Sequence, residues 1–416
     1  MLRRESSWVP SIRDGCLASP PSDLDANDGV RERGREVKVL HAITGLNTGG
    51  AEMGLCRLLA SLSPPGFQHM VVALGPEGAL SAKVAELAEL HHLDMRAGRM
   101  MPGDLLKLRG LLRRVEPDVI QCWMHHANFM VTLAAVGLGV PLAWGVRQSL
   151  YSLEREKPGT RWMFRACARL SRRPARIVYN SAVSRTQHVT FGFHDSRGVV
   201  IPNGFDTSAF APDPAARSRI RAEMAIAREA LVIGLVARVH PMKDHANFLR
   251  SAARFAAEHA NAAFVLVGDG ADESNPELTS LIDALHLRGK VHLCGPRTNI
   301  AAVNNALDIA SSSSSWGEAF PNAIAEAMAC GTPCVATDVG DVRDIIGETG
   351  VVVPSRDPVA LSEGWARLAT LGAEGRRELG RRARQRIVDR YSLAANAQAY
   401  AALWRSLAAR SAACAA

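Results

Sequence analysis

Short apolar segments alternate with longer amphipathic segments along most of the chain. In the first half, the apolar segments are residues 37–43, 69–74, 119–122, 142–145, 177–179 and 199–201. Strands that are joined through helices pair in parallel, and a parallel sheet is covered by helices on both faces. The alternation therefore predicts an α/β protein with parallel, helix-covered sheets.

A second series of the same kind follows the turn-rich residues 201–206 and a charged segment, 213–228, that predicts a helix. Its apolar segments are residues 231–237, 263–268, 291–294, 309–310, 334–336 and 351–353. A chain of 416 residues is longer than one hydrophobic core usually serves. We therefore predict two Rossmann-like domains, 36–205 and 206–390, the second closing with helices 358–373 and 375–390, and then an alanine-rich helix in 391–416.

The N-terminal residues 1–35 mix Arg, Ser, Pro and Asp without an apolar stretch of signal-peptide length, so we predict a disordered leader. The most apolar window, 133–143, is shorter than the ~18 residues that a membrane span needs and contains Gly137 and Gly139. We expect it to be a buried helix leading to a strand, and we expect no transmembrane helix.

Cysteine and histidine do not show the spacing of a metal site. Cys330 and Cys334 have no second pair nearby to complete a zinc site, and His125 and His126 are adjacent rather than four residues apart. Eight cysteines are scattered through the sequence, at positions 16, 56, 122, 167, 294, 330, 334 and 414. We expect reduced thiols in a cytoplasmic protein that needs neither a metal nor another cofactor.

Positive charge is concentrated between residues 155 and 176, where eight basic residues stand against one acidic residue in a chain of net charge +8. Arg161, Arg165 and Arg169 are spaced to share one helical face. A basic amphipathic helix can rest on anionic lipid headgroups or receive an acidic substrate, and a simple solvated face is an equally open alternative. Nucleic acid is not expected as a partner, because no recognised binding module accompanies the charge.

Two carboxylates, Glu318 and Glu326, flank a predicted helix start. Proline is favoured at the first helical position, so Pro321 predicts Glu318 in the entering loop and Glu326 inside the helix. The free N–H groups of Asn322 and Ala323 would then attract phosphate, while the carboxylates accept hydrogen bonds from sugar hydroxyls. That combination suits a nucleotide sugar.

The Glu-x7-Glu spacing, together with the run Ala-Met-Ala-Cys-Gly-Thr-Pro-Cys-Val-Ala-Thr-Asp at 327–338, resembles the retaining glycosyltransferases of family 4, of the type that builds bacterial surface or capsular polysaccharide. The resemblance implies the GT-B fold, in which two Rossmann-like domains face a central cleft and the last helix crosses back to the first domain. It also implies transfer of a sugar from a nucleoside diphosphate sugar to a glycan or polyprenyl-linked acceptor, with retention and without a metal. The basic helix would place the protein at the inner face of the cytoplasmic membrane.

Arg238 and Lys243, at the end of the second domain's first strand, match the family's Arg-x4-Lys pair. Cleavage of a glycosyl-phosphate bond leaves a diphosphate whose extra charge must be stabilised. A guanidinium fork and a mobile ammonium can do this together without a metal. Both are therefore predicted to be catalytic.

The resemblance also assigns the two carboxylates. Glu318 would hold the hydroxyls of the transferred sugar as a catalytic residue, and Glu326 would bind the ribose. The remaining donor-binding candidates are Gly49, Gly50, Gly268, Arg297, Phe320, Pro321, Asn322 and Ala323. The first three are glycines in loops that follow strands, and Arg297 lies in the loop expected near the nucleobase.

On the acceptor side, the loop after strand 119–122 contains His125, His126 and Asn128. Family members place a functional histidine there, often in a His-x-His pattern that this chain does not show, so the choice between the two histidines stays open. We prefer His126 as the catalytic one. Arg147, at the end of the next strand, is a candidate for holding an anionic acceptor or a phosphate.

Three alternative functions are compatible with some of the same residues. A non-catalytic partner of the same fold would be expected to lose charged residues such as Arg238, Lys243, Glu318 and Glu326, which are intact here. A nucleotide-sugar epimerase would isomerise the donor without an acceptor. A glycosidase dyad needs a carboxylic acid of raised pKa facing the glycosidic oxygen, a role that fits poorly if one carboxylate holds ribose.

Overall fold

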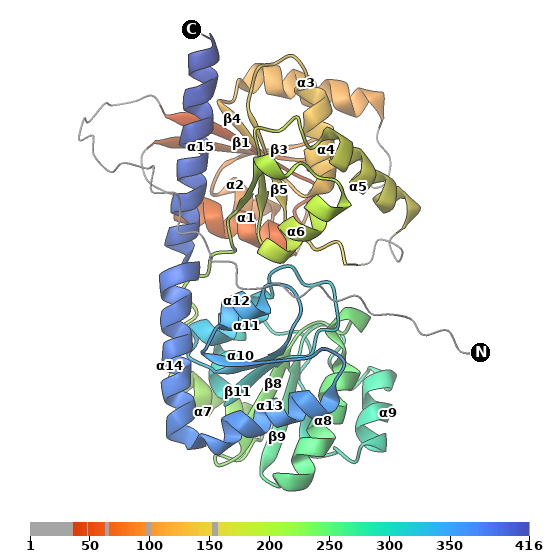
Figure 1. Ribbon diagram of the computed structural model, residues 1–416, viewed down its shortest axis with the longest axis vertical. Coiled ribbons are helices and arrows are strands. Elements are labelled where there is room, and N and C mark those ends of the chain that lie inside the picture. Colours follow the sequence, from red (N-terminus) through yellow and green to blue (C-terminus); the bar gives the residue numbers. More distant parts are fainter. Residues whose placement is uncertain (1–35, 48, 63–65, 97–100, 152–156, 416) are drawn as a thin grey trace. The chain divides into compact units, whose positions relative to one another are not determined.

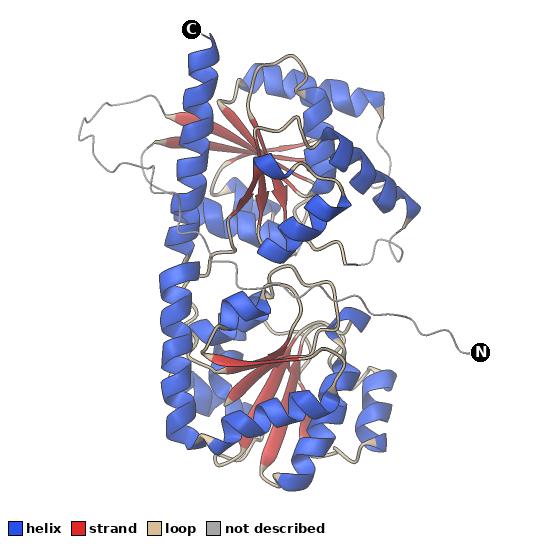
Figure 2. Cartoon of the chain, viewed as in Figure 1, coloured by secondary structure: helices blue, strands red, loops and turns tan. Residues whose placement is uncertain are grey.

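The computed structural model of the protein describes residues 36–47, 49–62, 66–96, 101–151 and 157–415. The predicted leader, residues 1–35, lies outside the described residues. Glu36–Ala416 belong to one compact unit. Figure 2 shows two sets of strands in this unit, each lying between helices.

The first sheet has seven parallel strands within the described residues, in the order β3-β2-β1-β4-β5-β6-β7 (Figure 1). The strands are β1 (Val37–Ile43), β2 (Phe67–Ala73), β3 (Glu89–His92), β4 (Val119–Trp123), β5 (Leu142–Val146), β6 (Arg176–Tyr179) and β7 (Gly198–Val200). The strand order reverses between β1 and β4. In open parallel sheets, ligands bind beyond the carboxyl ends of the strands at such a switch point.

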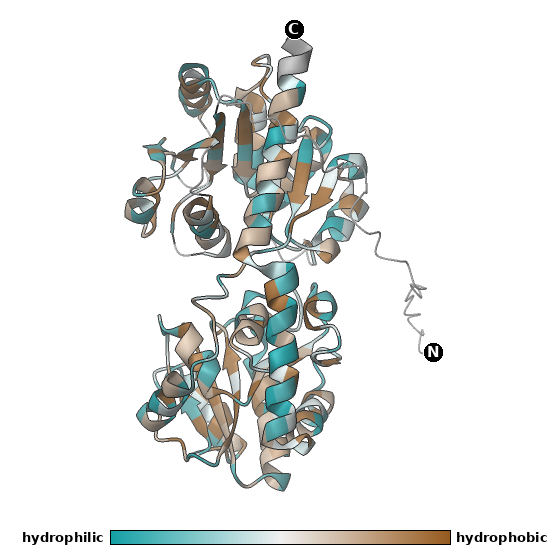
Figure 3. Ribbon diagram, turned by 90° about the vertical axis from the view of Figure 1, so that its left-hand side faces the viewer, coloured by the Kyte–Doolittle hydropathy of each residue, from teal (hydrophilic) through white to brown (hydrophobic). Residues whose placement is uncertain are grey.

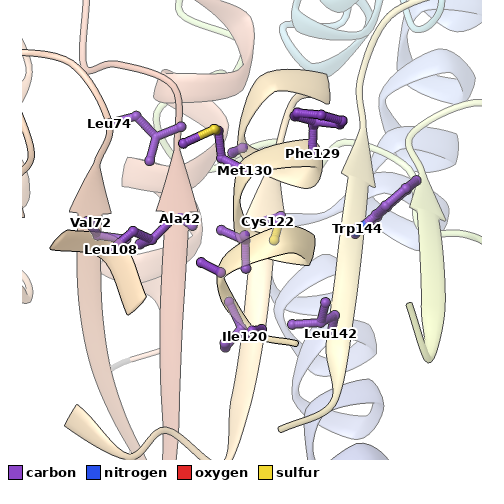
Figure 4. Close-up of a cluster of buried hydrophobic side chains, with 14 of the residues drawn as sticks. Ala42, Val72, Leu74, Leu108, Ile120, Cys122, Phe129, Met130, Leu142 and Trp144 are labelled. Carbon is purple, nitrogen blue, oxygen red and sulfur yellow. The ribbon is translucent and has the colours of Figure 1, made fainter. Parts of the chain in front are cut away.

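Alternate residues of these strands pack against different helices. On one face, Leu40, Ala42, Ile120 and Trp144 join a core with α3 (Pro102–Val115), α4 (His125–Ala134) and α5 (Pro158–Leu170). Figure 4 shows this core, with Leu74 and Met130 beyond the carboxyl ends of the strands and the sulfur of Met130 directed toward Leu74. The other face packs against α1 (Gly50–Ser61), α2 (Ser81–Ala85) and α15 (Leu393–Ala415). Between β6 and β7 the chain forms α6 (Ala182–Phe191) and the short helix Asp195–Arg197.

The second sheet has six parallel strands in the described residues, in the order β10-β9-β8-β11-β12-β13. They are β8 (Leu231–Val236), β9 (Ala262–Val267), β10 (Val291–Leu293), β11 (Ile309–Ser312), β12 (Cys334–Thr337) and β13 (Gly350–Val353). The helices of this domain are α7 (Pro214–Glu223), α8 (His245–Glu258), α9 (Pro276–Ala284), α10 (Ile300–Ala306), α11 (Asn322–Ala329), α12 (Val342–Ile346) and α13 (Pro358–Thr370), with a short helix at Pro241–Lys243. Its switch point lies between β8 and β11, so both domains have the Rossmann-like arrangement that the sequence predicts.

Two long helices end the chain, α14 (Gly372–Tyr391) and α15. In Figure 3, α14 is mostly teal, in keeping with its many charged residues, whereas α15 alternates between hydrophilic and hydrophobic residues. Tyr400 and Trp404 of α15 are fully buried in the core of the first domain. Trp404 also donates a hydrogen bond from Nε1 to Oε1 of Gln121 on β4 (3.1 Å).

Three sequence expectations need correction. The window 133–143 is not one buried helix, because α4 ends at Ala134 and both Gly137 and Gly139 take positive φ angles in the turn before β5. Helix 213–228 is shorter than expected: it ends at Glu223, and Ala225 has a left-handed φ of 53°. Strand β3 was not predicted, since its residues are mostly polar.

Among the described residues, none of the helices is both long enough and apolar enough to cross a bilayer. The described cysteine side chains are free thiols at positions 56, 122, 167, 294, 330 and 334. All but Cys294 are buried, as expected for structural thiols.

Candidate functional site

The carboxyl ends of β8, β9 and β10 converge closely around Gly268. This residue has a φ of 149°, and its N–H donates to the Gly295 carbonyl at 2.9 Å. A Cβ at this position would overlap the Ala237 carbonyl, and would lie 2.7 Å from the Arg238 nitrogen. Only glycine fits there, because the backbone that follows β8 packs directly against this loop.

Lys243 and Glu318 form an ion pair at the same edge. The Glu318 carboxylate also accepts a hydrogen bond from Ser314 Oγ at 2.7 Å, and it is almost fully buried. Lys243 ends the short helix Pro241–Lys243, and its backbone carbonyl accepts from Ser313 Oγ at 2.7 Å. The pair thus presents one cation and one carboxylate in fixed positions.

The serine-rich loop after β11 holds this ion pair in place. Ser315 N–H donates to the Met242 carbonyl at 2.8 Å, and Thr337 Oγ1 donates to the Ser314 carbonyl at 2.6 Å. Gly317 has a φ of 80°, and a Cβ there would collide with Met242. These contacts were not anticipated, although the run of five serines at 311–315 directly after a strand is a visible signal.

Helix α11 begins one residue later than the sequence predicts. Pro321 is the N-cap, with φ −75° and ψ 91°, and the first helical residue is Asn322. Pro321 stays outside the helix because its ψ is extended, while its carbonyl already accepts from Ile324 N–H at 3.2 Å. Glu318 still lies in the entering loop and Glu326 inside the helix. Asn322 and Ala323 are first-turn residues, whose amides have no partner within a helix.

Glu326 is bonded to a residue of the first domain. Arg57 on α1 donates from Nη2 to Glu326 Oε1 at 3.2 Å. Burial raises the pKa of the Glu326 carboxyl, and the charge and hydrogen bond of Arg57 oppose that rise. The sequence around Arg57 does not indicate that it contacts Glu326, because the two residues meet only when the chain folds.

The other second-domain candidates, Arg238, Arg297 and Phe320, differ in their exposure and in their partners. Arg238 is exposed on the loop after β8. Arg297 forms an ion pair with Glu223 of α7 at 2.5 Å. The Phe320 ring is buried, stacked on Phe205 with centroids 5.8 Å apart. Only the backbone of Phe320 is therefore available to a ligand.

Gly49 and Gly50 lie at the start of α1, after the loop that follows β1. Gly49 is the N-cap, and a Cβ on it would overlap the Glu52 carboxylate. A Cβ on Gly50 would lie 3.8 Å from Nδ2 of Asn322. The structure thus brings this loop of the first domain next to the start of α11.

A chain of hydrogen bonds leads from Asn322 into the first domain. Asn203 donates from Nδ2 to Oδ1 of Asn322 at 2.7 Å, and its own Oδ1 accepts from Nη2 of Arg147, also at 2.7 Å. Arg147 donates in turn to the Tyr400 hydroxyl at 3.1 Å and lies over the Trp123 ring at 4.9 Å. Arg147 therefore acts on the helix start through Asn203, a residue that sequence reasoning passed over in its Pro-Asn-Gly turn.

His125 and His126 have opposite environments. The His125 ring is 3% exposed, and its Nε2 lies 3.1 Å from Nε2 of His188. Burial and then the neighbouring His188 hold the pKa of His125 well below its usual value. His126 is exposed, and partial desolvation lowers its pKa as well. Asn128 is fully buried and bonded to the backbone of Gly145.

A cavity of about 910 Å³ lies in the first domain beyond the ends of β1 to β4. We call it the first-domain cavity. Its lining residues are Thr44, Gly45, Asn47, Glu52, Leu74, Gly75, Pro76, Asp94, Met95, Arg96, His126, Met130, Lys157, Gly159, Thr160, Trp162 and Met163. His125, His126 and Asn128 lie in α4, not in a loop as the sequence suggested, because the helix begins two residues after β4 ends. Among these three described residues only His126 faces the cavity, whereas His125 and Asn128 are buried in the core.

The described residues contain no cluster of three or more His, Cys, Asp or Glu side chains arranged to hold a metal ion. What the site offers instead is two basic side chains, two carboxylates, a glycine-lined edge and a helix start. Cations and helix amides suit a diphosphate, and carboxylates suit sugar hydroxyls.

Comparison with known protein families identifies the two domains. Residues 48–209 match the sequence profile of Glycosyltransferase Family 4, and residues 230–370 match that of Glycosyl transferases group 1. Together the two profiles match most of both domains, which confirms the resemblance to the glycosyltransferases of family 4.

The similar curated proteins are also glycosyltransferases. The D-inositol 3-phosphate glycosyltransferase of Geodermatophilus obscurus is 32% identical over 234 residues, which cover 51% of this chain and 50% of that protein. The putative glycosyltransferase EpsF of Bacillus subtilis is 26% identical over 317 residues, covering 72% and 79%. The chain thus spans about half the length of the first of these relatives.

Solved structures show the same fold. HepE of Anabaena, in a crystal structure with UDP, has a TM-score of 0.78 and 22% identity, covering 89% of this chain and 100% of that one. Sucrose-phosphate synthase from Thermosynechococcus elongatus has a TM-score of 0.75 and 18% identity, covering 90% and 100%. Two Rossmann-like domains with this likeness define the GT-B fold, as predicted.

Proposed function

We propose that the protein is a retaining glycosyltransferase that moves a sugar from a nucleoside diphosphate sugar to a glycan or lipid-linked acceptor in the synthesis of a cell-surface polysaccharide. The observation that carries the proposal is the ion pair of Lys243 and Glu318, which the serine loop after β11 holds in place. It puts a cation and a carboxylate at the sheet edge where a nucleotide sugar would bind.

In the proposed reaction, the glycosidic bond to the diphosphate breaks and the new bond forms on the same face of the sugar. Arg238 and Lys243 neutralise the charge that develops on the leaving diphosphate, so the residues themselves supply the stabilisation that a metal gives other enzymes. Glu318 accepts hydrogen bonds from the sugar hydroxyls. The departing phosphate takes the proton of the acceptor hydroxyl.

Donor binding is proposed to use both domains. Glu326 holds the ribose hydroxyls, while the first-turn amides of α11 and the loop at Gly49 and Gly50 approach the diphosphate. The loop at Arg297 lies toward the base. A solved HepE structure contains UDP-glucose, which makes uridine donors the first to test.

The acceptor is proposed to reach the first domain at the inner face of the cytoplasmic membrane. The described part of the basic segment supports this, because Arg165 and Arg169 of α5 are exposed while Met163, Phe164 and Cys167 are buried. Arg155 lies outside the described residues. If the protein ignores anionic vesicles at low salt, this localisation is wrong.

The test is a screen of UDP-, GDP- and ADP-sugars with EDTA present, following thermal stabilisation and slow hydrolysis of the donor. Stabilisation by one nucleotide sugar is expected in the wild type and should be lost in Glu326→Gln. Glu363→Gln, which changes an exposed carboxylate on α13, is the matched control and should behave as wild type.

The same screen separates the other functions. If every donor fails at millimolar concentration, the protein is a non-catalytic partner. Donor isomerisation without an acceptor would instead indicate an epimerase. A strict requirement for a divalent metal would overturn the role given to Arg238 and Lys243.

A further inference from the structure

The first-domain cavity is larger than one sugar needs. Its volume of about 910 Å³ is near the upper end of the roughly 300–1,000 Å³ typical of ligand pockets. It opens beside His126 and beside Asn47, which lies two residues before Gly49. A ligand in this cavity would therefore reach the loop that we place at the donor diphosphate.

Polar side chains line the side of the cavity formed by the strand ends. Asn47 and Asp94 lie in the loops after β1 and β3, and Glu52 and His126 lie in the first turns of α1 and α4, next to the ends of β1 and β4. Carboxylate, amide and neutral imidazole groups can each exchange hydrogen bonds with hydroxyls. Desolvation lowers the pKa of His126, which favours the neutral ring. This side suits a sugar.

Apolar side chains line the side formed by the helices. Met130 comes from α4, and Trp162 and Met163 come from α5, with Leu74 and Met95 next to them. Figure 4 shows Met130 directed toward Leu74 at this end of the sheet. Methionine is flexible and adapts to the shape of an apolar partner. Sugar hydroxyls placed against this wall would lose their hydrogen bonds to water without replacement.

Trp162 gives the apolar wall an exposed end. Its side chain is 52% exposed, although it packs edge-on against Phe129 with ring centroids 5.5 Å apart. A large aromatic residue at a cavity mouth that is left partly in water offers apolar area for a ligand to cover.

The charges that line the cavity balance. Glu52 and Asp94 are matched by Arg96 and Lys157. The lining as a whole therefore carries no excess charge that would favour an ionised ligand over a neutral one. The cavity therefore fits a neutral sugar joined to an apolar group better than it fits a free anion.

We propose that the acceptor is an amphiphile, a sugar that carries a hydrocarbon chain. The sugar lies on the side of Glu52, Asp94 and His126, and the chain runs along Met130, Met163 and Trp162. This inference rests on the proposed function, since it chooses the lipid-linked acceptor over the free glycan and names the residues that select it.

The direct test compares binding of glucose with that of octyl β-glucoside below its micelle concentration, by calorimetry on the full chain. The octyl glucoside should bind at least about tenfold more tightly, with one site per chain, because each buried methylene contributes about 0.8 kcal/mol. Equal affinity for the two compounds would overturn the proposal.

Trp162→Ala should weaken octyl glucoside binding by about tenfold and leave glucose binding unchanged. The matched control is Leu106→Ala on α3, which removes a side chain that is 69% exposed and does not line the cavity. If Leu106→Ala weakens binding as much as Trp162→Ala does, the compound is adhering to the surface and the proposal fails.

The donor screen keeps this test separate from the proposed function. Octyl glucoside that binds with the expected variant effects, in a chain that recognises no nucleotide sugar, would support the cavity assignment and overturn the transferase. A chain that binds a donor but treats glucose and octyl glucoside alike would support the transferase and overturn the amphiphilic acceptor.

Discussion

Arg57 and Glu326 are 269 positions apart in the sequence, and they form a hydrogen-bonded ion pair of 3.2 Å between α1 of the first domain and α11 of the second. The Glu326 side chain is 13% exposed, so its carboxylate has little contact with water and is paired with the Arg57 guanidinium instead. The group that we assign to the donor ribose is therefore already held by the opposite domain.

Removal of Arg57 should change how donor binding depends on pH. Burial raises the pKa of Glu326 and Arg57 lowers it, so Arg57→Gln should raise it further. Ribose binding needs the ionised carboxylate, so affinity should fall as the pH drops through this pKa. Calorimetric titrations of the donor from pH 5 to 8 should show the fall at higher pH in the variant.

The matched control for Arg57→Gln is Arg377→Gln, which removes an exposed arginine that pairs with Glu374 on α14. Its pH profile should match that of the wild type. Identical profiles for the wild type and Arg57→Gln would show that Glu326 does not bind the donor as a carboxylate.

Lys243→Met should lower kcat by about 100-fold to 1000-fold, the usual cost of losing one preorganised donor to a developing anion. The variant keeps the unbranched shape and most of the length of the side chain, and it removes the ammonium group that bonds to Glu318. Turnover at saturating donor measures the effect. Lys107→Met, at an exposed position on α3, is the control. A normal kcat in Lys243→Met would remove this residue from the mechanism.

The buried pair of His125 and His188 should make the fold sensitive to acid. Burial lowers the pKa of His188 from 6.5 to about 4 and lowers that of His125 too. Between pH 6.5 and 4, the unfolded chain binds protons that the folded chain does not, so stability should fall as the pH drops through this window and stay level above it.

Thermal unfolding measured from pH 8 to 4 checks this expectation, with His188→Gln as the variant. Its melting temperature should be lower than that of the wild type at pH 8 and should decline less steeply below pH 6.5. An equal slope in both proteins would place the acid sensitivity elsewhere.

Trp404 should anchor α15 to the first domain. It is fully buried, and Trp404→Ala should lower the unfolding free energy of that domain by about 3–5 kcal/mol. Trp404→Phe should lower it by roughly 1–3 kcal/mol, because Gln121 Oε1 is then left without its donor. Urea unfolding followed by circular dichroism provides the measurement. Leu371→Ala, at an exposed position, should change it by less than about 0.5 kcal/mol.

The sequence predicts the sheets well, because buried parallel strands are continuous apolar runs. Residues 37–43 coincide with β1, and 231–237 differ from β8 only at the last residue. Strand β3 was not predicted, because the polar residues Glu89, His91 and His92 are typical of a loop. In the structure, pairing with β2 provides hydrogen bonds for the backbone of these residues. At 133–143, the hydrophobicity of the sequence predicted a helix. The helix ends at Ala134 instead, because Gly137 and Gly139 take positive φ angles and form a turn.

The grouping of the candidate-site residues was predictable only where these residues are close in sequence. Glu318 and Glu326 share one short motif, and Lys243 follows a strand end. Arg57 and Asn203 come to the site through the folding of distant segments, so nothing in their neighbourhood indicates their partners. His125 and His126 are identical in sequence terms, and the turn of α4 sends one ring into the core and the other toward the cavity.

Phe205 and Ser392 form an isolated β-bridge, with Phe205 N–H donating to the Tyr391 carbonyl and Leu393 N–H donating to the Phe205 carbonyl. The chain therefore enters and leaves its second domain at neighbouring points. Residues 206–391 amount to an insertion between β7 and α15 of the first domain. Domains whose ends lie together can be exchanged as units. A hybrid chain would need just two adjacent junctions to combine this first domain with the second domain of another protein of the same fold.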